Sequence, residues 1–249
     1  MTPVFAVVGH PNKGKSSIVS TIAQNDAIAI SPRSGTTRDT HRYDISIGEA
    51  GYTLVDTPGF QRPSRALAWL QEHAPSADRR HDAIRQFIAD PECRQQFPEE
   101  VMLLKPIMEG SAILYVVDGS RPYGAEYEAE MEILRWTGQA SMALINPIEN
   151  EDHVQGWQQA LGQYFKIVRV FNAMQADFEK VVAILEAFSH IREEWQSALA
   201  DIVNEYRNQR ATRETTLCLH RNSSSSSTRF RKTITGNGLT NTNQTINRR

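Results

Sequence analysis

Short apolar runs alternate with helical patterns along most of this chain. The runs typical of buried strands lie at residues 4–8, 112–117, 142–145 and 165–171. The helical patterns between them lie at residues 17–23, 127–136 and 154–164. Strands that alternate with helices predict an α/β fold, with a doubly wound, mostly parallel sheet in three α/β/α layers. In such a fold, ligands bind at the carboxyl ends of the strands.

Two neighbouring segments depart from this pattern. Residues 43–47 alternate between polar and apolar side chains, and residues 52–55 follow after a tight turn ending at Gly51. We expect these segments to pair as an antiparallel hairpin at one edge of the sheet. The preceding residues 26–40 are polar and are predicted to form a loop.

A long connection, residues 60–110, separates this hairpin from the next buried strand. Helical patterns at 66–73, 81–89 and 99–109 predict that it is a helical insertion. Near the other end of the chain, apolar residues at helical spacing predict one long helix over residues 177–207.

The loop after the first strand matches the pattern G-x-x-x-x-G-K-[ST]. In such a loop, backbone N–H groups and the N-terminus of the next helix face a phosphate group. Lys15 is predicted to reach the β- and γ-phosphates, and the Ser16 hydroxyl to ligate Mg²⁺. His10 has no carboxylate nearby in the sequence and is interpreted as a loop residue rather than a catalytic base. The predicted phosphate cradle consists of Gly9, Asn12, Lys13, Gly14, Lys15, Ser16 and Ser17.

Asp56-Thr57-Pro58-Gly59 follows the strand at residues 52–55 directly. An aspartate at this place holds Mg²⁺, usually through water, and Gly59 lets the backbone approach the γ-phosphate. The same four residues are also good turn formers. Thr36 and Thr37 lie in the polar loop, where a hydroxyl can complete the metal shell while the γ-phosphate is present.

These segments together resemble the Era-like branch of the P-loop GTPases. The three boxes are Gly9-His-Pro-Asn-Lys-Gly-Lys-Ser16, Gly35-Thr-Thr-Arg-Asp39 and Asp56-Thr-Pro-Gly59. The resemblance covers about residues 1–190 and implies a domain that binds GTP or GDP with Mg²⁺. It also implies that Thr37 is the threonine that joins Ser16 and Asp56 as a metal ligand, and that Gly59 senses the γ-phosphate.

The insertion at 60–110 and the run at 115–124 resemble one bacterial branch of this family. Members of that branch carry a further C-terminal domain of unknown function. We expect that domain to be truncated or altered here, with residues 191–210 continuing the C-terminal helix.

Phe60 follows Gly59, at the place where Ras-type enzymes carry the glutamine that orients the attacking water. Phenylalanine cannot polarise water. The resemblance implies another electrostatic aid, which in some relatives is K⁺ held partly by an asparagine that Asn12 matches. We therefore expect slow, K⁺-stimulated hydrolysis, and an Asn12 that only shapes the loop is the alternative. The predicted catalytic residues are Lys15, Asn12, Thr37 and Gly59.

The guanine-recognition box of the resembled family, N-K-x-D, is altered in this chain. Asn146-Pro147-Ile148-Glu149 has proline in place of the lysine and glutamate in place of the aspartate. Glutamate carries the same acceptor oxygens on a longer stem, so bidentate recognition of guanine requires a shift in register. Asn172-Ala173 resembles the final box, whose backbone N–H contacts the guanine oxygen. GTP stays the expected nucleotide.

Charge and composition separate the end of the chain from the rest. The 249 residues carry a net charge of −2, but residues 211–249 hold seven basic residues and one acidic residue, so residues 1–210 carry −8. This basic tail is rich in serine, threonine and asparagine and is predicted to be disordered. Cys93 and Cys218 form no C-x-x-C pair, which argues against a disulfide framework or a zinc site. The early first strand leaves no room for a signal peptide, and no apolar run reaches the ~18 residues of a membrane span, so we expect a cytoplasmic protein.

The leading hypothesis for function is a GTP-hydrolysing molecular switch. The alternative, favoured by Phe60 and the altered guanine box, is a nucleotide-dependent binding module with negligible turnover. The resemblance implies a protein or ribosomal RNA effector, for which residues 60–110 are the expected surface. Dimerisation through the switch regions is a separate hypothesis. The basic tail is either an arm that attracts RNA or membranes or the product of a reading-frame change or truncation, and we assign it no function.

Overall fold

The computed structural model describes residues 2–23, 29–34, 40–212 and 215. The chain divides into two compact units, Met1–Tyr206 and Arg207–Arg249. Residues 211, 212 and 215 are helical, so the predicted disorder does not begin at residue 211, and the rest of the tail lies outside the described residues. Among the residues described, no helix has both the length and the apolar character needed to cross a membrane.

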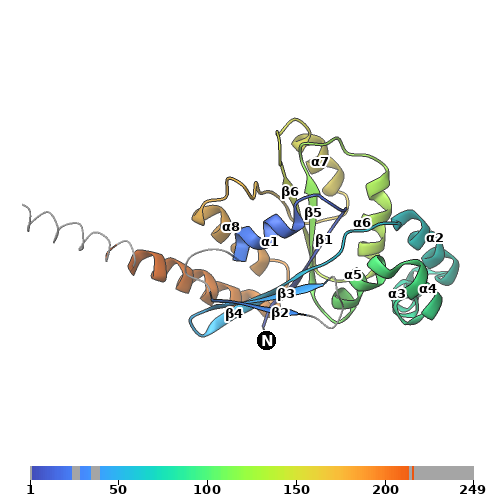
Figure 1. The fold of residues 1–249 in the computed structure, drawn as a ribbon, viewed down its shortest axis with the longest axis horizontal. Coiled ribbons are helices and arrows are strands. Elements are labelled where there is room, and N and C mark those ends of the chain that lie inside the picture. Colours follow the sequence, from blue (N-terminus) through green and yellow to red (C-terminus); the bar gives the residue numbers. More distant parts are fainter. Residues whose placement is uncertain (1, 24–28, 35–39, 213–214, 216–249) are drawn as a thin grey trace, which may run out of the picture. The chain divides into compact units, whose positions relative to one another are not determined.

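The first unit is built on one sheet, whose described strands number seven and lie in the order β2-β3-β4-β1-β5-β6-β7 (Figure 1). Parallel pairing joins β4 to β1, β1 to β5, β5 to β6 and β6 to β7. The mostly parallel α/β fold predicted from the sequence is therefore confirmed. The strands are β1 (Val4–Val8), β2 (Ala29–Ser34), β3 (His41–Ile47), β4 (Ala50–Asp56), β5 (Ala112–Asp118), β6 (Ser141–Asn146) and β7 (Val168–Val170).

The antiparallel edge of the sheet is wider than predicted. β3 and β4 form the expected hairpin, with Gly48 in the turn at a φ of 61°. β2 pairs with β3 as well, with Ala29 opposite Ser46, so the hairpin is not the edge and the predicted polar loop contains a strand. An edge strand needs no continuous apolar pattern and tolerates a proline such as Pro32, which explains why the sequence did not reveal it.

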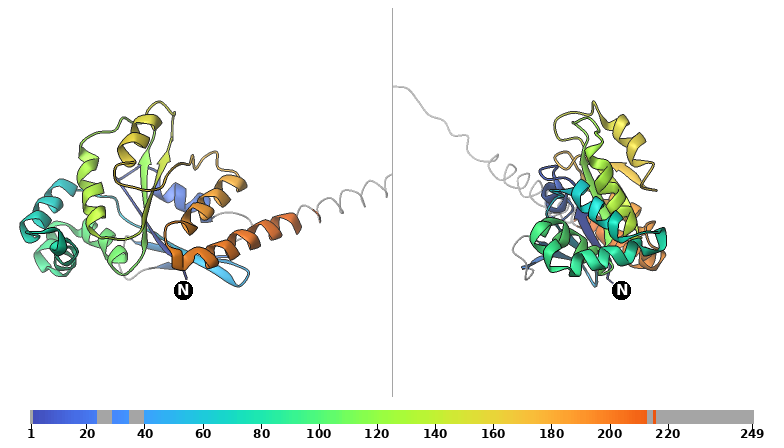
Figure 2. Two further views of the ribbon diagram at one scale, coloured as in Figure 1. Left: turned by 180° about the vertical axis from the view of Figure 1, so that it is seen from behind. Right: turned by 90° about the vertical axis from the view of Figure 1, so that its right-hand side faces the viewer.

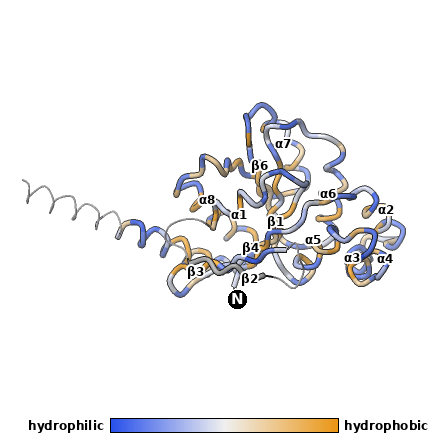
Figure 3. The backbone as a smooth tube through the Cα atoms, viewed as in Figure 1, coloured by the Kyte–Doolittle hydropathy of each residue, from blue (hydrophilic) through white to orange (hydrophobic). Residues whose placement is uncertain are grey.

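The helices cover both faces of the sheet and enclose two hydrophobic clusters. Along β1, Phe5 and Val7 belong to one cluster and Ala6 and Val8 to the other, as the two-residue period of a strand requires. α1, α8 and residues 196–206 pack on the first face, and α2 to α7 pack on the second (Figure 2). The hydrophobic segments accordingly follow the central strands and the inner sides of the helices (Figure 3). The helices are α1 (Lys15–Ala23), α2 (Pro63–His73), α3 (Arg80–Ala89), α4 (Pro91–Gln96), α5 (Pro98–Met108), α6 (Glu126–Trp136), α7 (Val154–Leu161) and α8 (Phe178–Ser189).

The insertion is helical as predicted, with one helix more than the pattern showed. α2, α3 and α5 match the three predicted helices, and α4 is additional. α4 has only six residues, too few for a visible period. Pro91 stands at its first position, and the Asp90 side chain accepts hydrogen bonds from the backbone N–H groups of Glu92 and Cys93. This cap specifies where the short helix begins.

The single long helix predicted at 177–207 is wrong, because the chain breaks after α8. A short 3-10 helix at Glu193–Trp195 and a second helix from residue 196 follow the break. Arg192 holds the break in place by donating hydrogen bonds to the Gly110 carbonyl, at 3.1 Å, and to the Gln139 side chain, at 2.7 Å. Its guanidinium also lies 4.5 Å from the ring centre of Trp195. These tertiary contacts end a helix that local periodicity alone would continue.

Candidate nucleotide-binding site

The loop between β1 and α1 lies at the carboxyl end of the central strand (Figure 1). It lines a cavity of about 560 Å³. Its backbone is left-handed at Asn12, with a φ of 58°, and positive in φ at Gly9 and Gly14. These are conformations that glycine and asparagine tolerate best. The cavity lining includes the predicted cradle residues Asn12, Lys13, Gly14, Lys15, Ser16 and Ser17, together with Gly59.

The Lys15 ammonium is folded back onto this loop. Its Nζ donates a hydrogen bond to the His10 carbonyl at 2.8 Å and lies 3.4 Å from the Gly9 carbonyl. Burial lowers the pKa of Lys15, and the charges of Asp56 and Glu130 oppose that shift. The two hydrogen-bond acceptors described for this cation are neutral carbonyls, which an anionic ligand can replace.

Ser16 and Asp56 meet beside this lysine. The Ser16 hydroxyl donates a hydrogen bond of 2.6 Å to Oδ2 of Asp56. The Oδ1 atom of Asp56 is buried and has no hydrogen-bond partner among the described residues. Burial raises the pKa of Asp56, and the Ser16 hydroxyl and the Lys15 charge oppose that shift. A hydroxyl, a carboxylate and an unsatisfied carboxylate oxygen fit the oxygen ligands that Mg²⁺ requires. Thr37, the third predicted metal ligand, lies outside the described residues.

The segment after Asp56 is fastened to the phosphate loop. The Thr57 hydroxyl donates to the Val7 carbonyl at 2.7 Å, and the Phe60 N–H donates to the Gly9 carbonyl at 3.2 Å. A Cβ atom at Gly59 would lie 2.5 Å from the Pro11 nitrogen, so only glycine permits this approach. Gly59 is therefore placed against the loop, as its predicted role requires.

Phe60 does not face the cavity. Its side chain is fully buried in the second hydrophobic cluster, where it anchors the segment. The next residue, Gln61, lines the cavity instead. Gln61 stands one residue later than the glutamine of Ras-type enzymes, so its place in the sequence did not indicate that it lines the cavity.

Glu100 of α5 holds the chain that follows Gly59. Its Oε1 atom accepts hydrogen bonds from the backbone N–H groups of Gln61, at 2.8 Å, and Arg62, at 2.5 Å. The side chain is completely buried, and its Oε2 atom has no hydrogen-bond partner in the described part of the chain. Through this carboxylate the helical insertion is joined directly to residues 59–62, here called the sensor segment, at one end of the cavity. Nothing in the sequence pattern distinguishes Glu100 from its neighbour Glu99.

His10 has a carboxylate partner that lies far away in the sequence. Its Nδ1 atom is 2.7 Å from Oε1 of Glu130 on α6, and Tyr115 donates a hydrogen bond of 2.9 Å to the other oxygen. Burial raises the pKa of Glu130, which is completely shielded from solvent, and the bonds from His10 and Tyr115 oppose that shift. His10 lies in the loop, and its ring is held by a buried acid that the sequence did not indicate.

The residues predicted to recognise the base are brought together in part. The Asn146 side chain accepts a hydrogen bond from the Ala173 N–H at 3.2 Å and lies against Gly14 of the loop. Asn172 donates to the Pro147 carbonyl at 3.0 Å, so the two boxes support each other. Of the Asn172-Ala173 box, whose backbone N–H is predicted to contact guanine, the Ala173 N–H is thus already engaged.

Two charged contacts flank this side of the site. Glu149 is exposed and forms an ion pair of 3.2 Å with Arg121, from the loop after β5. Lys13 lies 3.8 Å from Oδ2 of Asp118, at the end of β5. Glu149 therefore has to share or leave its guanidinium partner if it is to bind a base.

Comparison with known families gives the same assignment as the geometry. Residues 4–146 match the family described as "50S ribosome-binding GTPase", which is more than half of the chain. The chain belongs to this GTPase family. Its resemblance to the Era-like P-loop GTPases is thereby confirmed. A second match, to a domain of unknown function termed DUF3482, covers residues 158–219 and so extends past the change in composition near residue 210.

Individual relatives of this GTPase family are distant. GTPase Der from Prochlorococcus marinus is 25% identical over 191 residues, which are 74% of this chain and 36% of that protein. GTPase Era from Fusobacterium nucleatum is 23% identical over 171 residues, covering 66% of this chain and 48% of that one. The chain thus spans less than half the length of both relatives. A crystal structure of Aquifex aeolicus Era bound to GDP and AlF₄⁻ is 19% identical, with a TM-score of 0.47, and covers 74% of this chain and 56% of that one.

Proposed function

We propose that the first unit binds GTP with Mg²⁺ and hydrolyses it to GDP and phosphate as a molecular switch. The observation that carries this proposal is the contact between the Ser16 hydroxyl and the Asp56 carboxylate, beside the Lys15 ammonium. An unsatisfied carboxylate oxygen is buried at the same point. Membership of the GTPase family supports the same activity.

Each of these groups has a distinct part in the proposal. Bound Mg²⁺ would be held by Ser16, by Asp56 through water and by Thr37, and would neutralise charge on the phosphates. The Lys15 ammonium exchanges its two loop carbonyls for phosphate oxygens, which gives a charge-assisted contact in a partly desolvated site. Gly59 presents its backbone to the γ-phosphate because the segment already touches the loop at Pro11.

Positioning of the attacking water is proposed to be weak, so intrinsic hydrolysis is slow. Phe60 is buried away from the cavity and contributes no polar group. K⁺ held partly by Asn12 would stabilise charge at the reacting phosphates without a side-chain base. The Asn12 side chain is exposed at the cavity, which supports this role, whereas its left-handed backbone equally fits a residue that only shapes the loop.

The second candidate function is a nucleotide-dependent binding module with negligible turnover. The ion pair between Glu149 and Arg121 favours it, because a carboxylate already paired binds guanine less strongly. Under this proposal the nucleotide orders the loop and the segment after Gly59, and no bond is broken.

The partner of the switch is proposed to be a ribosomal RNA or protein effector in the cytoplasm. The family description, which names the 50S ribosome, supports this choice. The insertion that contains α2 to α5 is the proposed effector surface, because Glu100 ties it to the sensor segment. A further proposal is that two copies of this chain dimerise through their switch regions.

Equilibrium binding of fluorescent nucleotides tests the proposal. GTP and GDP are expected to bind more tightly with Mg²⁺ than with EDTA, and more tightly than ATP in either condition. Ser16→Ala removes one metal ligand and is expected to reduce the Mg²⁺ effect. Ser20→Ala removes another exposed hydroxyl of α1, one that does not line the cavity, and serves as the matched control. ATP bound as tightly as GTP, or a Mg²⁺ effect unchanged in Ser16→Ala, would overturn the proposal.

A further inference from the structure

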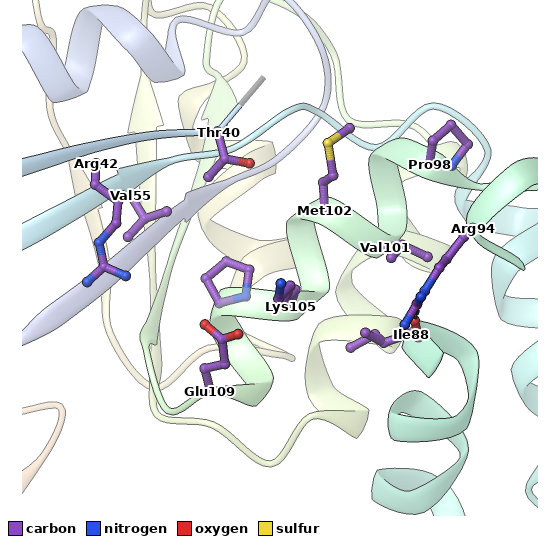
Figure 4. Close-up of a pocket in the computed structure, with 11 residues that line it drawn as sticks. Thr40, Arg42, Val55, Ile88, Arg94, Pro98, Val101, Met102, Lys105 and Glu109 are labelled. Carbon is purple, nitrogen blue, oxygen red and sulfur yellow. Dashed lines mark hydrogen bonds between the residues drawn. The ribbon is translucent and has the colours of Figure 1, made fainter. Parts of the chain in front are cut away.

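A second cavity, of about 650 Å³, lies between the hairpin and the helical insertion (Figure 4). β3 contributes Arg42 and β4 contributes Val55 to its edge, Thr40 lies just before β3, and α5 forms much of its wall. It lies apart from the phosphate loop, which lines a separate cavity. We call it the α5 groove, and its lining residues are Thr40, Arg42, Val55, Ile88, Arg94, Pro98, Val101, Met102, Lys105, Pro106 and Glu109.

The α5 groove concentrates positive charge on an otherwise acidic unit. Arg42, Arg94 and Lys105 line it, and among the described residues that line it Glu109 is the one carboxylate. Figure 4 shows Arg42 and Arg94 on opposite sides with Lys105 between them. None of these four side chains forms an ion pair with another described residue. Residues 1–210 carry a net charge of −8, so this cluster is a local exception that attracts an anionic partner.

The rest of the groove is apolar. Val55 and Val101 are buried beneath it, and Ile88 and Met102 are half-buried. Met102 can adapt its shape to an incoming apolar side chain. The described residues that line the groove include no aromatic side chain, so they offer no surface on which single-stranded nucleic acids stack their bases. Cations around an apolar floor fit a peptide that carries both acidic and apolar side chains.

The groove is also connected to the nucleotide site through two elements. Val55 directly precedes Asp56, and α5 carries Glu100, which binds the backbone of Gln61 and Arg62. A ligand that moves α5 or β4 therefore acts on the metal ligand and on the sensor segment. This connection rests on the proposed function, whereas the binding of a peptide in the groove does not.

We propose that the α5 groove binds an acidic, partly apolar segment of a protein partner. The carboxylates of that segment pair with Arg42, Arg94 and Lys105, and its apolar side chains cover Val55, Val101 and Met102. The ionic part of this contact is exposed enough to be screened by salt.

Fluorescence anisotropy tests the groove with a short fluorescein-labelled peptide of alternating glutamate and leucine, measured on the full chain without nucleotide. Lys105→Glu and Arg94→Glu change exposed residues and are each expected to weaken the peptide about fivefold. Lys166→Glu is the matched control, because this exposed lysine precedes β7, at the opposite edge of the sheet, and it is expected to leave the affinity unchanged. Added NaCl is expected to weaken binding to the unaltered chain.

Three results would overturn the proposal. The first is that the peptide does not bind. The second is that Lys166→Glu and the groove variants change the peptide affinity equally. The third is that a labelled oligouridine RNA binds in place of the peptide and that the groove variants abolish this RNA binding. Circular dichroism of each variant shows that it is folded. Because the assay contains no nucleotide, a lack of peptide binding says nothing about GTP hydrolysis. Conversely, a chain that does not hydrolyse GTP can still be tested for peptide binding.

Discussion

The imidazole Nδ1 of His10, in the phosphate loop, lies 2.7 Å from the Oε1 atom of Glu130 on α6, 120 residues away. The carbonyl of the same His10 accepts the hydrogen bond from the Lys15 ammonium. The position of the loop lysine is thus tied to a buried acid on the second face of the sheet. A buried carboxylate with two partners fixes a loop more firmly than backbone turns alone.

Glu130→Gln is expected to flatten the pH dependence of stability. Burial raises the pKa of Glu130 against the opposing effects of His10, Tyr115 and Lys15, so the folded state binds this proton more readily than the unfolded state. Stability from this group is therefore present at low pH and is lost as pH rises from the ordinary glutamate pKa through the raised one. Urea unfolding from about pH 5 to about pH 8 should show a smaller loss of unfolding free energy in the variant, and Asp56, whose pKa burial also raises, contributes to the loss that remains. A slope equal to that of the unaltered chain would contradict this account.

Glu100→Ala is expected to destabilise the chain by about 2–4 kcal/mol, because the backbone N–H groups of Gln61 and Arg62 lose their buried acceptor. Glu100→Gln keeps an acceptor oxygen and should cost less. Glu99→Ala, at the adjacent and only half-buried position on α5, is the matched control and should stay within about 0.5 kcal/mol. Urea unfolding measures all three, and similar losses at positions 99 and 100 would refute the role of the carboxylate.

Glu149→Ala is expected to weaken GTP about tenfold while leaving ATP unchanged, because only guanine offers the paired N–H groups that a carboxylate accepts. Arg121→Ala is expected to tighten GTP, since it removes the competing partner of Glu149. Glu151→Ala, an exposed neighbour, controls for the loss of charge near the site. Competition between labelled GDP and each nucleotide gives the affinities. If Glu149→Ala leaves the affinity for GTP unchanged, this box does not recognise guanine.

Asn12→Gly separates the two roles of the loop asparagine. Glycine accepts the φ of 58° without strain but has no amide oxygen. Hydrolysis by the unaltered chain is expected to be faster in K⁺ than in Na⁺, and the variant should lose this difference while keeping its affinity for GDP. If the unaltered chain hydrolyses GTP equally fast in both salts, Asn12 only shapes the loop.

Much of this molecule could be predicted from local sequence. Apolar runs identified the central strands, because strands buried on both faces need continuous hydrophobicity, and the phosphate loop has a fixed spacing of glycine, lysine and serine. β2 escaped detection because an edge strand needs no such run. The break after α8 escaped because Arg192 makes contacts with residues that are distant in the sequence.

The supporting shell of the site could not be predicted in the same way. Glu130 and Glu100 look like ordinary charged positions on amphipathic helices until the fold buries them. Each meets its partner across long stretches of chain, so no spacing rule connects them. The place of Gln61 in the cavity lining could not be predicted for a simpler reason, because Phe60 stands between Gly59 and this glutamine.

Single-turnover hydrolysis of GTP by the purified chain, in K⁺ and Mg²⁺, tests the central claim most directly. The account predicts that bound GTP is converted to GDP and phosphate, and that Asp56→Ala slows this step about a hundredfold. Lys15→Ala should abolish it, which excludes a contaminating enzyme. Bound GTP that persists without conversion, or a rate that neither variant changes, would contradict the claim that Ser16, Asp56 and Lys15 form a hydrolytic site.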